Sequence, residues 1–262
     1  MRRTCANPRS KPAGDLTGSG RLGGRSSSTR RPGRRPDIPA VPSPKRHPYD
    51  QWAPDARALD LVGDKWTLLI VRDLVSGPRR FVELQRVLPG ISTEQLRSRL
   101  NRMVADGLLT RQRYREVPPR VDYELTERSR ALVPVIAELA RWGYRWSWGH
   151  PRPTESIDIG AIFRATPGLL ADTPLGLVEL RVDERSYWLG LGDGPATVHE
   201  RGSDDEGPDA TISGSEADWI AALGPAGALD ALTVTGDMSL AERVFAAIAP
   251  TRDAPAAEVH AA

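Results

Sequence analysis

Residues 91–126 read ISTEQLRSRLNRMVADGLLTRQRYREVPPRVDYELT. Ser92 and Gln95 have the spacing of a capping box, in which each side chain accepts a hydrogen bond from the backbone N–H of the other residue. Leu96 and Leu100 follow at the spacing that places apolar side chains on one face of a helix. The segment therefore predicts a helix that starts after Ser92 and buries one face.

The second half of the segment predicts a β-hairpin. Gly107 is expected to end the helix, because glycine readily adopts the left-handed conformation found there. The runs 109–114 and 121–125 have the composition of strands. Pro118 and Pro119 lie between them and cannot donate to a strand ladder, so they mark a loop at the hairpin tip.

Three shorter helices are expected before this segment. The first covers 55–61 and the second is capped by Asp64. Phe81, Leu84 and Leu88 give the third an apolar stripe, and a short turn separates it from the helix at Ser92. Helix, turn, helix and basic hairpin form the layout of a winged helix-turn-helix domain, to which we assign residues 47–150.

The polar side chains of this layout have the chemistry of DNA recognition. Short hydrogen-bonding side chains at the start of the helix can contact base edges in the major groove. Arginines on three converging elements, including Arg111 of the hairpin, can contact phosphates. The expected DNA-binding residues are Arg79, Arg80, Ser92, Thr93, Gln95, Arg97, Ser98, Arg99, Arg102, Arg113, Arg115 and Arg120.

A long helix is expected from about Glu127, with Pro134 either kinking it or marking its true start. Its apolar residues, spaced three and four apart, form a short heptad seam suited to a partner helix. They are Leu132, Val135, Leu139, Trp142 and Trp146. Packing of this helix on its own domain is the alternative interpretation.

Charge is segregated along the chain, whose net charge is only +2. Residues 1–46 carry 12 Lys/Arg and 2 Asp/Glu, and residues 151–262 carry 7 and 19. The first segment is rich in Pro, Gly, Ser and Arg and is interpreted as a disordered basic tail. The basic segments suit a polyanion such as double-stranded DNA, which the acidic end would repel.

A second, smaller α/β domain is expected at 158–250, after a linker at 151–157 and before a frayed end at 251–262. Helical patterns cover 159–170, a segment capped by Ser215, and a last segment for which Ser239 is the expected cap. Five short runs between them have the composition of strands. The fold class of the whole chain is therefore α+β.

The N-terminal half resembles the HxlR-type transcriptional regulators. The matching stretches are ARALDLVGDKWTLLIVRDL (56–74), GPRRF (77–81), PGIS (89–92), GLLTR (107–111) and EVPPRVDYELT (116–126). The resemblance implies a homodimer formed through the first and last helices, bound to a near-palindromic operator. It adds Leu59 and Trp66 to the expected dimer interface. Ala53 stands where many members carry a cysteine, so redox sensing at that position is not expected.

The C-terminal half resembles the sterol carrier protein type 2 fold through DATISG (209–214) and LTVTGD (232–237). This resemblance implies a five-stranded sheet with helices over one face and an apolar tunnel. The residues expected to line a ligand pocket are Phe163, Leu177, Trp188, Trp219 and Phe245. The alternative is that these side chains fill a core.

Several classes of protein are disfavoured by composition. The single cysteine, Cys5, and four scattered histidines provide no metal-binding cluster, so neither a metal nor another cofactor is expected. No Ser/His/acid arrangement suggests an enzyme. No apolar run is long enough to span a bilayer, and the N-terminus lacks the apolar core of a secretory signal, so we expect a cytoplasmic protein.

The sequence thus predicts a homodimeric, sequence-specific transcriptional repressor, modulated by an apolar small molecule bound in the C-terminal domain. Two other functions stay open. A small-molecule or lipid carrier would use the helical domain only to dimerise, and a nucleoid-type protein would bind DNA without sequence preference.

Overall fold

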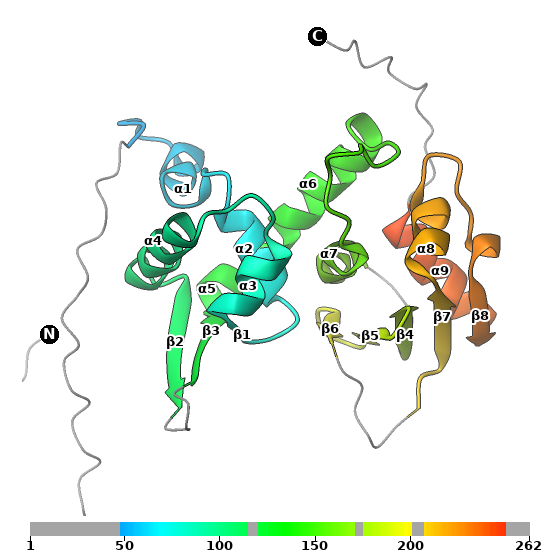
Figure 1. The fold of residues 1–262 in the computed structure, drawn as a ribbon. Coiled ribbons are helices and arrows are strands. Elements are labelled where there is room, and N and C mark those ends of the chain that lie inside the picture. The colour runs from blue at the N-terminus through cyan, green and yellow to red at the C-terminus, as the bar shows by residue number, and fades with distance from the viewer. Residues whose placement is uncertain (1–47, 115–119, 171–174, 201–206, 250–262) are drawn as a thin grey trace, which may run out of the picture. The chain divides into compact units, whose positions relative to one another are not determined.

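The computed structural model describes residues 48–114, 120–170, 175–200 and 207–249 (Figure 1). All of these residues belong to one compact unit, which spans 40–262. The expected tails at 1–46 and 251–262 lie outside the described residues, as do Arg115 and the two prolines of the hairpin tip.

Four helices open the described chain where the sequence places them: α1 (Pro54–Val62), α2 (Thr67–Leu74), α3 (Phe81–Val87) and α4 (Thr93–Ala105). The N-cap of α2 is Trp66 and not the expected Asp64, which lies two residues earlier and accepts the backbone N–H groups of Trp66 and Thr67 at 2.9 and 3.1 Å. The capping box of α4 is confirmed, since Ser92 and Gln95 exchange two hydrogen bonds of 3.2 Å. Gly107, with φ at +70°, follows the end of α4 as expected.

The predicted hairpin is also confirmed and gains a third strand. β2 (Leu109–Tyr114) pairs antiparallel with β3 (Arg120–Leu125), and β1 (Arg79–Arg80) pairs with the other edge of β3. The sheet order is β1-β3-β2. Leu84, Leu96 and Leu100 are fully buried in the core that joins this sheet to the helices.

The expected helix from Glu127 is divided in two. α5 (Glu127–Arg130) ends before α6 (Val133–Trp146) begins. Pro134 lies in the first turn of α6 and therefore marks a start, because proline lacks the N–H that a helix interior requires.

The C-terminal part contains the predicted five-stranded sheet, with the strand order β6-β5-β4-β7-β8. β4 and β7 pair in parallel and the other neighbours are antiparallel. The elements are α7 (Ile159–Ala165), the 3-10 turn η1 (Thr166–Gly168), β4 (Gly176–Val182), β5 (Arg185–Leu191), β6 (Thr197–His199), β7 (Ala210–Gly214), α8 (Glu216–Leu223), the 3-10 turn η2 (Leu229–Ala231), β8 (Thr233–Gly236) and α9 (Met238–Ile248).

Two helix boundaries in this part differ from expectation. α7 stops before residue 170 because Pro167 cannot donate a backbone hydrogen bond, and the chain tightens into η1. Ser215 caps α8 as expected, but the cap of α9 is Asp237, which accepts the N–H of Leu240 at 3.1 Å, and not Ser239.

The two faces of the larger sheet differ in chemistry. Val178, Leu180 and Val182 of β4 are fully buried in the apolar core, whereas Glu179 alternates to the other face. There the Glu179 carboxylate accepts hydrogen bonds from Ser186, from Arg181 at 2.7 Å and from Thr211 at 3.2 Å. A carboxylate with three donors on three strands ties the centre of the sheet together.

The hydrogen bonds of Glu179 predict a pH-dependent stability. Burial alone would raise the pKa of the Glu179 carboxyl, but the bonds from Ser186 and Arg181 outweigh it and hold the pKa below its usual value. Its stabilisation is therefore present above the unfolded-state pKa of about 4.3 and is lost as the pH falls through the lower folded-state pKa. Glu179→Gln is expected to lower the free energy of unfolding at pH 7 by about 1–2 kcal/mol.

Urea unfolding at several pH values tests this prediction. The difference between wild type and Glu179→Gln should be full above the unfolded-state pKa of about 4.3 and should shrink as the pH falls below it through the lower folded-state pKa of Glu179. Glu184→Gln, in the exposed turn between β4 and β5, is the matched control and should change little at any pH. A pH-independent deficit in Glu179→Gln would contradict the electrostatic explanation.

Candidate nucleic-acid interface

Helix α4 leaves its first turn and one side uncovered. Leu96 and Leu100 are fully buried, whereas Ser92, Thr93, Gln95, Arg97 and Ser98 are exposed. The exposed set holds four of the short polar side chains that the sequence predicts for DNA recognition, together with one arginine.

Neighbouring groups hold this polar turn in place. Gln85 of α3 donates to the Thr93 hydroxyl at 2.7 Å, and Gln95 is held by the capping box. Arg97 pairs with Glu94 at 2.9 Å on the exposed surface. Exposed pairs of this kind contribute little to stability, so Arg97 can exchange Glu94 for a stronger anion.

The hairpin places further arginines beside α4, which packs against β2 (Figure 1). Arg111 and Arg113 are two residues apart on β2, so they lie on the same face of the strand, and both are exposed. Together with the exposed Arg97 of α4 and Arg80 of β1, they make up what we call the basic surface, in which the strand register turns Arg80 to the sheet face opposite Arg111 and Arg113.

Two other expected DNA-binding arginines form intramolecular ion pairs, and a third is half-buried. Arg99 is half-buried and pairs at 2.9 Å with Asp64, which lies just before α2. Arg120 pairs with Asp122 at 2.6 Å, and its guanidinium lies 5.4 Å from the centre of the Tyr114 ring. Arg102 is half-buried.

Arg79 departs most from expectation, because its side chain is only 10% exposed. Its Nε donates to the backbone oxygen of Asp73 at 2.6 Å, and its Nη2 pairs with Glu200. A residue predicted to bind phosphate is thus occupied by a carboxylate from the C-terminal part of the chain.

The expected dimer interface is exposed in the single chain over most of its length. Leu59, Val135, Leu139, Trp142 and Trp146 are between 46% and 60% exposed. The two remaining expected residues, Trp66 and Leu132, are half-buried against the helical core. Trp52, which was not among the expected interface residues, is 94% exposed just before α1.

The five expected pocket residues do not come together. Phe163, Trp219 and Phe245 lie in the packed core, where the rings of Phe163 and Trp219 meet edge to face with centroids 4.8 Å apart. Leu177 and Trp188 share the strand face of Glu179, which is the opposite face of the sheet. The described residues therefore do not arrange the five side chains around one apolar tunnel.

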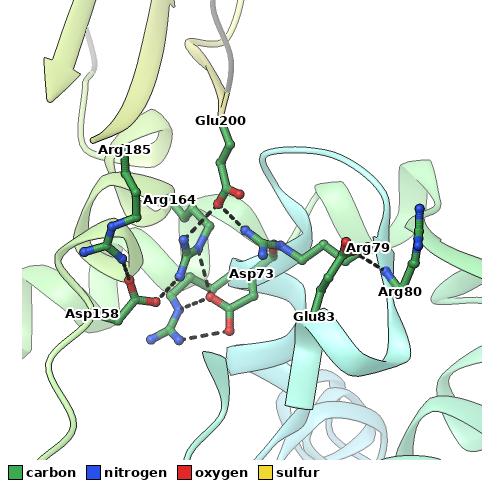
Figure 2. A network of polar contacts seen from close by, with 9 residues as sticks. Asp73, Arg79, Arg80, Glu83, Asp158, Arg164, Arg185 and Glu200 are labelled. Carbon is green, nitrogen blue, oxygen red and sulfur yellow. Dashed lines mark hydrogen bonds and ion pairs between the residues drawn. The ribbon is translucent and has the colours of Figure 1, made fainter. Parts of the chain in front are cut away.

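A buried ion network was not anticipated from the sequence (Figure 2). Arg164 of α7 is 1% exposed and pairs with Asp73 of α2 at 2.9 Å, with Glu200 at 3.0 Å and with Asp158. Burial alone would lower the pKa of the Arg164 guanidinium, but these three carboxylates raise it. The signal that could have revealed the network is a single charged residue within the otherwise apolar sequence IGAIFRA.

Other kinds of site receive no support from the described residues. Each helix in that part of the chain is too short or too polar to cross a bilayer. Within the same ranges, His, Cys, Asp and Glu side chains form no group of three or more that could hold a metal ion.

The residues of the basic surface lie in a part of the chain that matches the sequence model of a known protein family. Residues 61–150 match a family model described as HxlR-like helix-turn-helix. The HTH-type transcriptional regulator YybR of Bacillus subtilis is 35% identical over 97 residues, which cover 37% of this chain and 78% of YybR. The HTH-type regulator sll1512 of Synechocystis is 40% identical over 93 residues, covering 36% of this chain and 69% of the relative.

Solved structures also match about a third of the chain. The reduced form of the transcriptional regulator YodB from B. subtilis is 35% identical with a TM-score of 0.33, covering 36% of this chain and 92% of YodB. The family model ends at residue 150, so the five-stranded sheet lies beyond it.

Proposed function

The chain belongs to the HxlR-like helix-turn-helix family, and from that premise we propose that it is a sequence-specific DNA-binding regulator of transcription. The observation that carries the proposal is the exposed first turn of α4. Its buried side is anchored by Leu96 and Leu100, and its polar side presents Thr93, Gln95 and Ser98 to solvent. In helix-turn-helix proteins the start of the second helix contacts base edges in the major groove.

The basic surface supplies the phosphate contacts of this proposal. Arg97 lies on α4 itself, Arg111 and Arg113 lie on the hairpin, and Arg80 lies on the strand that pairs with it. Arginines on separate elements can hold the DNA backbone on both sides of the inserted helix, which fixes its register.

The proposal includes a homodimer. Val135, Leu139, Trp142 and Trp146 form an apolar face along α6 that the single chain leaves uncovered, and isolated soluble chains rarely expose such a face. Two copies joined there would present two α4 helices to successive major grooves of a near-palindromic operator. Where that operator overlaps a promoter, the bound dimer would repress by excluding polymerase.

An apolar effector is not part of this proposal. The residues expected to form its pocket lie on opposite faces of the sheet, so their placement does not support it. The sterol-carrier character of the C-terminal part and the domain boundaries at 150 and 158 likewise stay predictions.

The first test is DNA selection with the full chain, followed by fluorescence anisotropy at 150 mM salt. The selected duplex should bind at least ~10³-fold more tightly than a scrambled duplex of the same composition. Arg111→Ala/Arg113→Ala should weaken binding to both duplexes and reduce the slope of log K against log salt by about 2. Arg243→Ala, an exposed arginine on α9, is the matched control and should leave both unchanged.

Equal affinity for selected and scrambled DNA would contradict sequence-specific regulation and favour a nucleoid-type binder. Equal effects of the hairpin double variant and of Arg243→Ala would contradict the assignment of the basic surface.

The second test concerns the dimer. Leu139→Glu/Trp142→Glu is expected to convert a dimer into a monomer in sedimentation velocity, because two charges would enter an apolar interface. Met238→Glu, at an exposed apolar residue of the C-terminal part, should leave the dimer intact. A wild-type chain that sediments as a monomer at about 10 μM, or a double variant that remains dimeric, would contradict an interface on α6.

A further inference from the structure

Arg79 lies beside the basic surface but is turned away from solvent. Its neighbour Arg80 is exposed, and both belong to β1, which pairs with the hairpin strand β3. The Arg79 guanidinium instead contacts the backbone oxygen of Asp73 and the carboxylate of Glu200. The chain separation of Arg79 and Glu200 is 121 residues, so a distant segment supplies the anion that this arginine binds.

The Glu200 oxygen that Arg79 binds, Oε1, is shared with the buried network shown in Figure 2. This oxygen accepts from Nη1 of Arg164 at 3.0 Å, and Nε of the same arginine donates to Asp73 at 2.9 Å. Asp73 is fully buried, whereas the Glu200 side chain is 39% exposed. The Arg164–Asp73 pair is therefore excluded from water, whereas the ion pairs of Glu200 are partly hydrated. These form the weaker end of the network, because water and salt screen hydrated pairs.

A cavity of about 380 Å³ adjoins the weaker end. Arg79 and Glu200 both line it, together with Glu83, Arg86 and the turn at residues 76–78. Solvent and a second anion can thus reach the Arg79–Glu200 pair without unfolding the core. Arginine binds a phosphate through the same paired geometry that it uses for a carboxylate.

We propose that Glu200 is an intramolecular competitor of DNA phosphate for Arg79. This inference rests on the proposed DNA-binding function and adds a means of regulating it. With the pair closed, the C-terminal part occupies one arginine and lowers the affinity for DNA. With the pair open, Arg79 becomes an added phosphate contact at the cavity that it lines, while Arg164 and Asp73 keep the fold together.

The test compares two variants that each remove one negative charge. Glu200→Gln releases Arg79, whereas Glu216→Gln removes a carboxylate that pairs with Arg185 at 3.6 Å. Affinity for a scrambled duplex is measured by anisotropy from 50 to 200 mM salt with the full chain. Glu200→Gln should bind about three- to tenfold more tightly at 50 mM and steepen the salt slope by about 0.9, the value for one added phosphate contact. Glu216→Gln should reproduce neither change.

Two further variants separate competition from a structural role. Glu200→Asp keeps the charge but shortens the side chain by one methylene, so it should show a smaller gain of the same sign. Arg79→Ala/Glu200→Gln should lose the whole gain, because the released arginine is absent. The urea midpoint of each variant verifies that the chain remains folded.

The competitor role is overturned if Glu200→Gln matches Glu216→Gln in affinity and slope, or if its gain persists without Arg79. If Glu200→Gln leaves DNA affinity unchanged while Arg111→Ala/Arg113→Ala lowers it, Glu200 is not a competitor, but the proposed DNA-binding function still holds. Failure of every protein, wild type included, to bind DNA would refute the proposed function and the competitor together.

Discussion

The buried guanidinium of Arg164 is the constraint on which the rest of the arrangement depends. A cation that is 1% exposed cannot remain without anionic partners, and three carboxylates surround it. Asp73 comes from α2 of the helix-turn-helix part, while Asp158 and Glu200 come from the C-terminal part. Removal of one partner would leave the other charge buried and unpaired, at a cost of about 3–5 kcal/mol, so packing of α7 against α2 requires both members of the Arg164–Asp73 pair.

The ion pairs of Arg164 connect the C-terminal part directly to the helix-turn-helix part. A C-terminal domain attached through a linker alone would make no direct contact with the side chains of the DNA-binding part. Here Arg164 orients Glu200, and Glu200 contacts Arg79 at the edge of the basic surface. A change in the C-terminal part therefore has a short physical route to a side chain close to the proposed DNA contacts.

Most of the helix-turn-helix part could be predicted because its signals are local. The capping box at Ser92, the left-handed Gly107 and the strand pattern around the hairpin each depend on residues a few positions apart. The roles of Arg79 and Arg99 could not be predicted, since their partners Glu200 and Asp64 are distant in sequence. Likewise, the resemblance to the sterol carrier protein type 2 fold implied a pocket that included Leu177 and Trp188, but strand register turns both away from the core.

The Arg164–Asp73 pair is expected to couple the helix-turn-helix part and the C-terminal part energetically. A double-mutant cycle with Asp73→Asn and Arg164→Met measures this coupling, using urea unfolding of the full chain. If the two side chains are directly coupled, the sum of the losses of unfolding free energy in the two single variants should exceed the loss in the double variant by more than about 1 kcal/mol. Losses that add to within about 0.5 kcal/mol would show that the two side chains do not support each other, and would contradict this expectation.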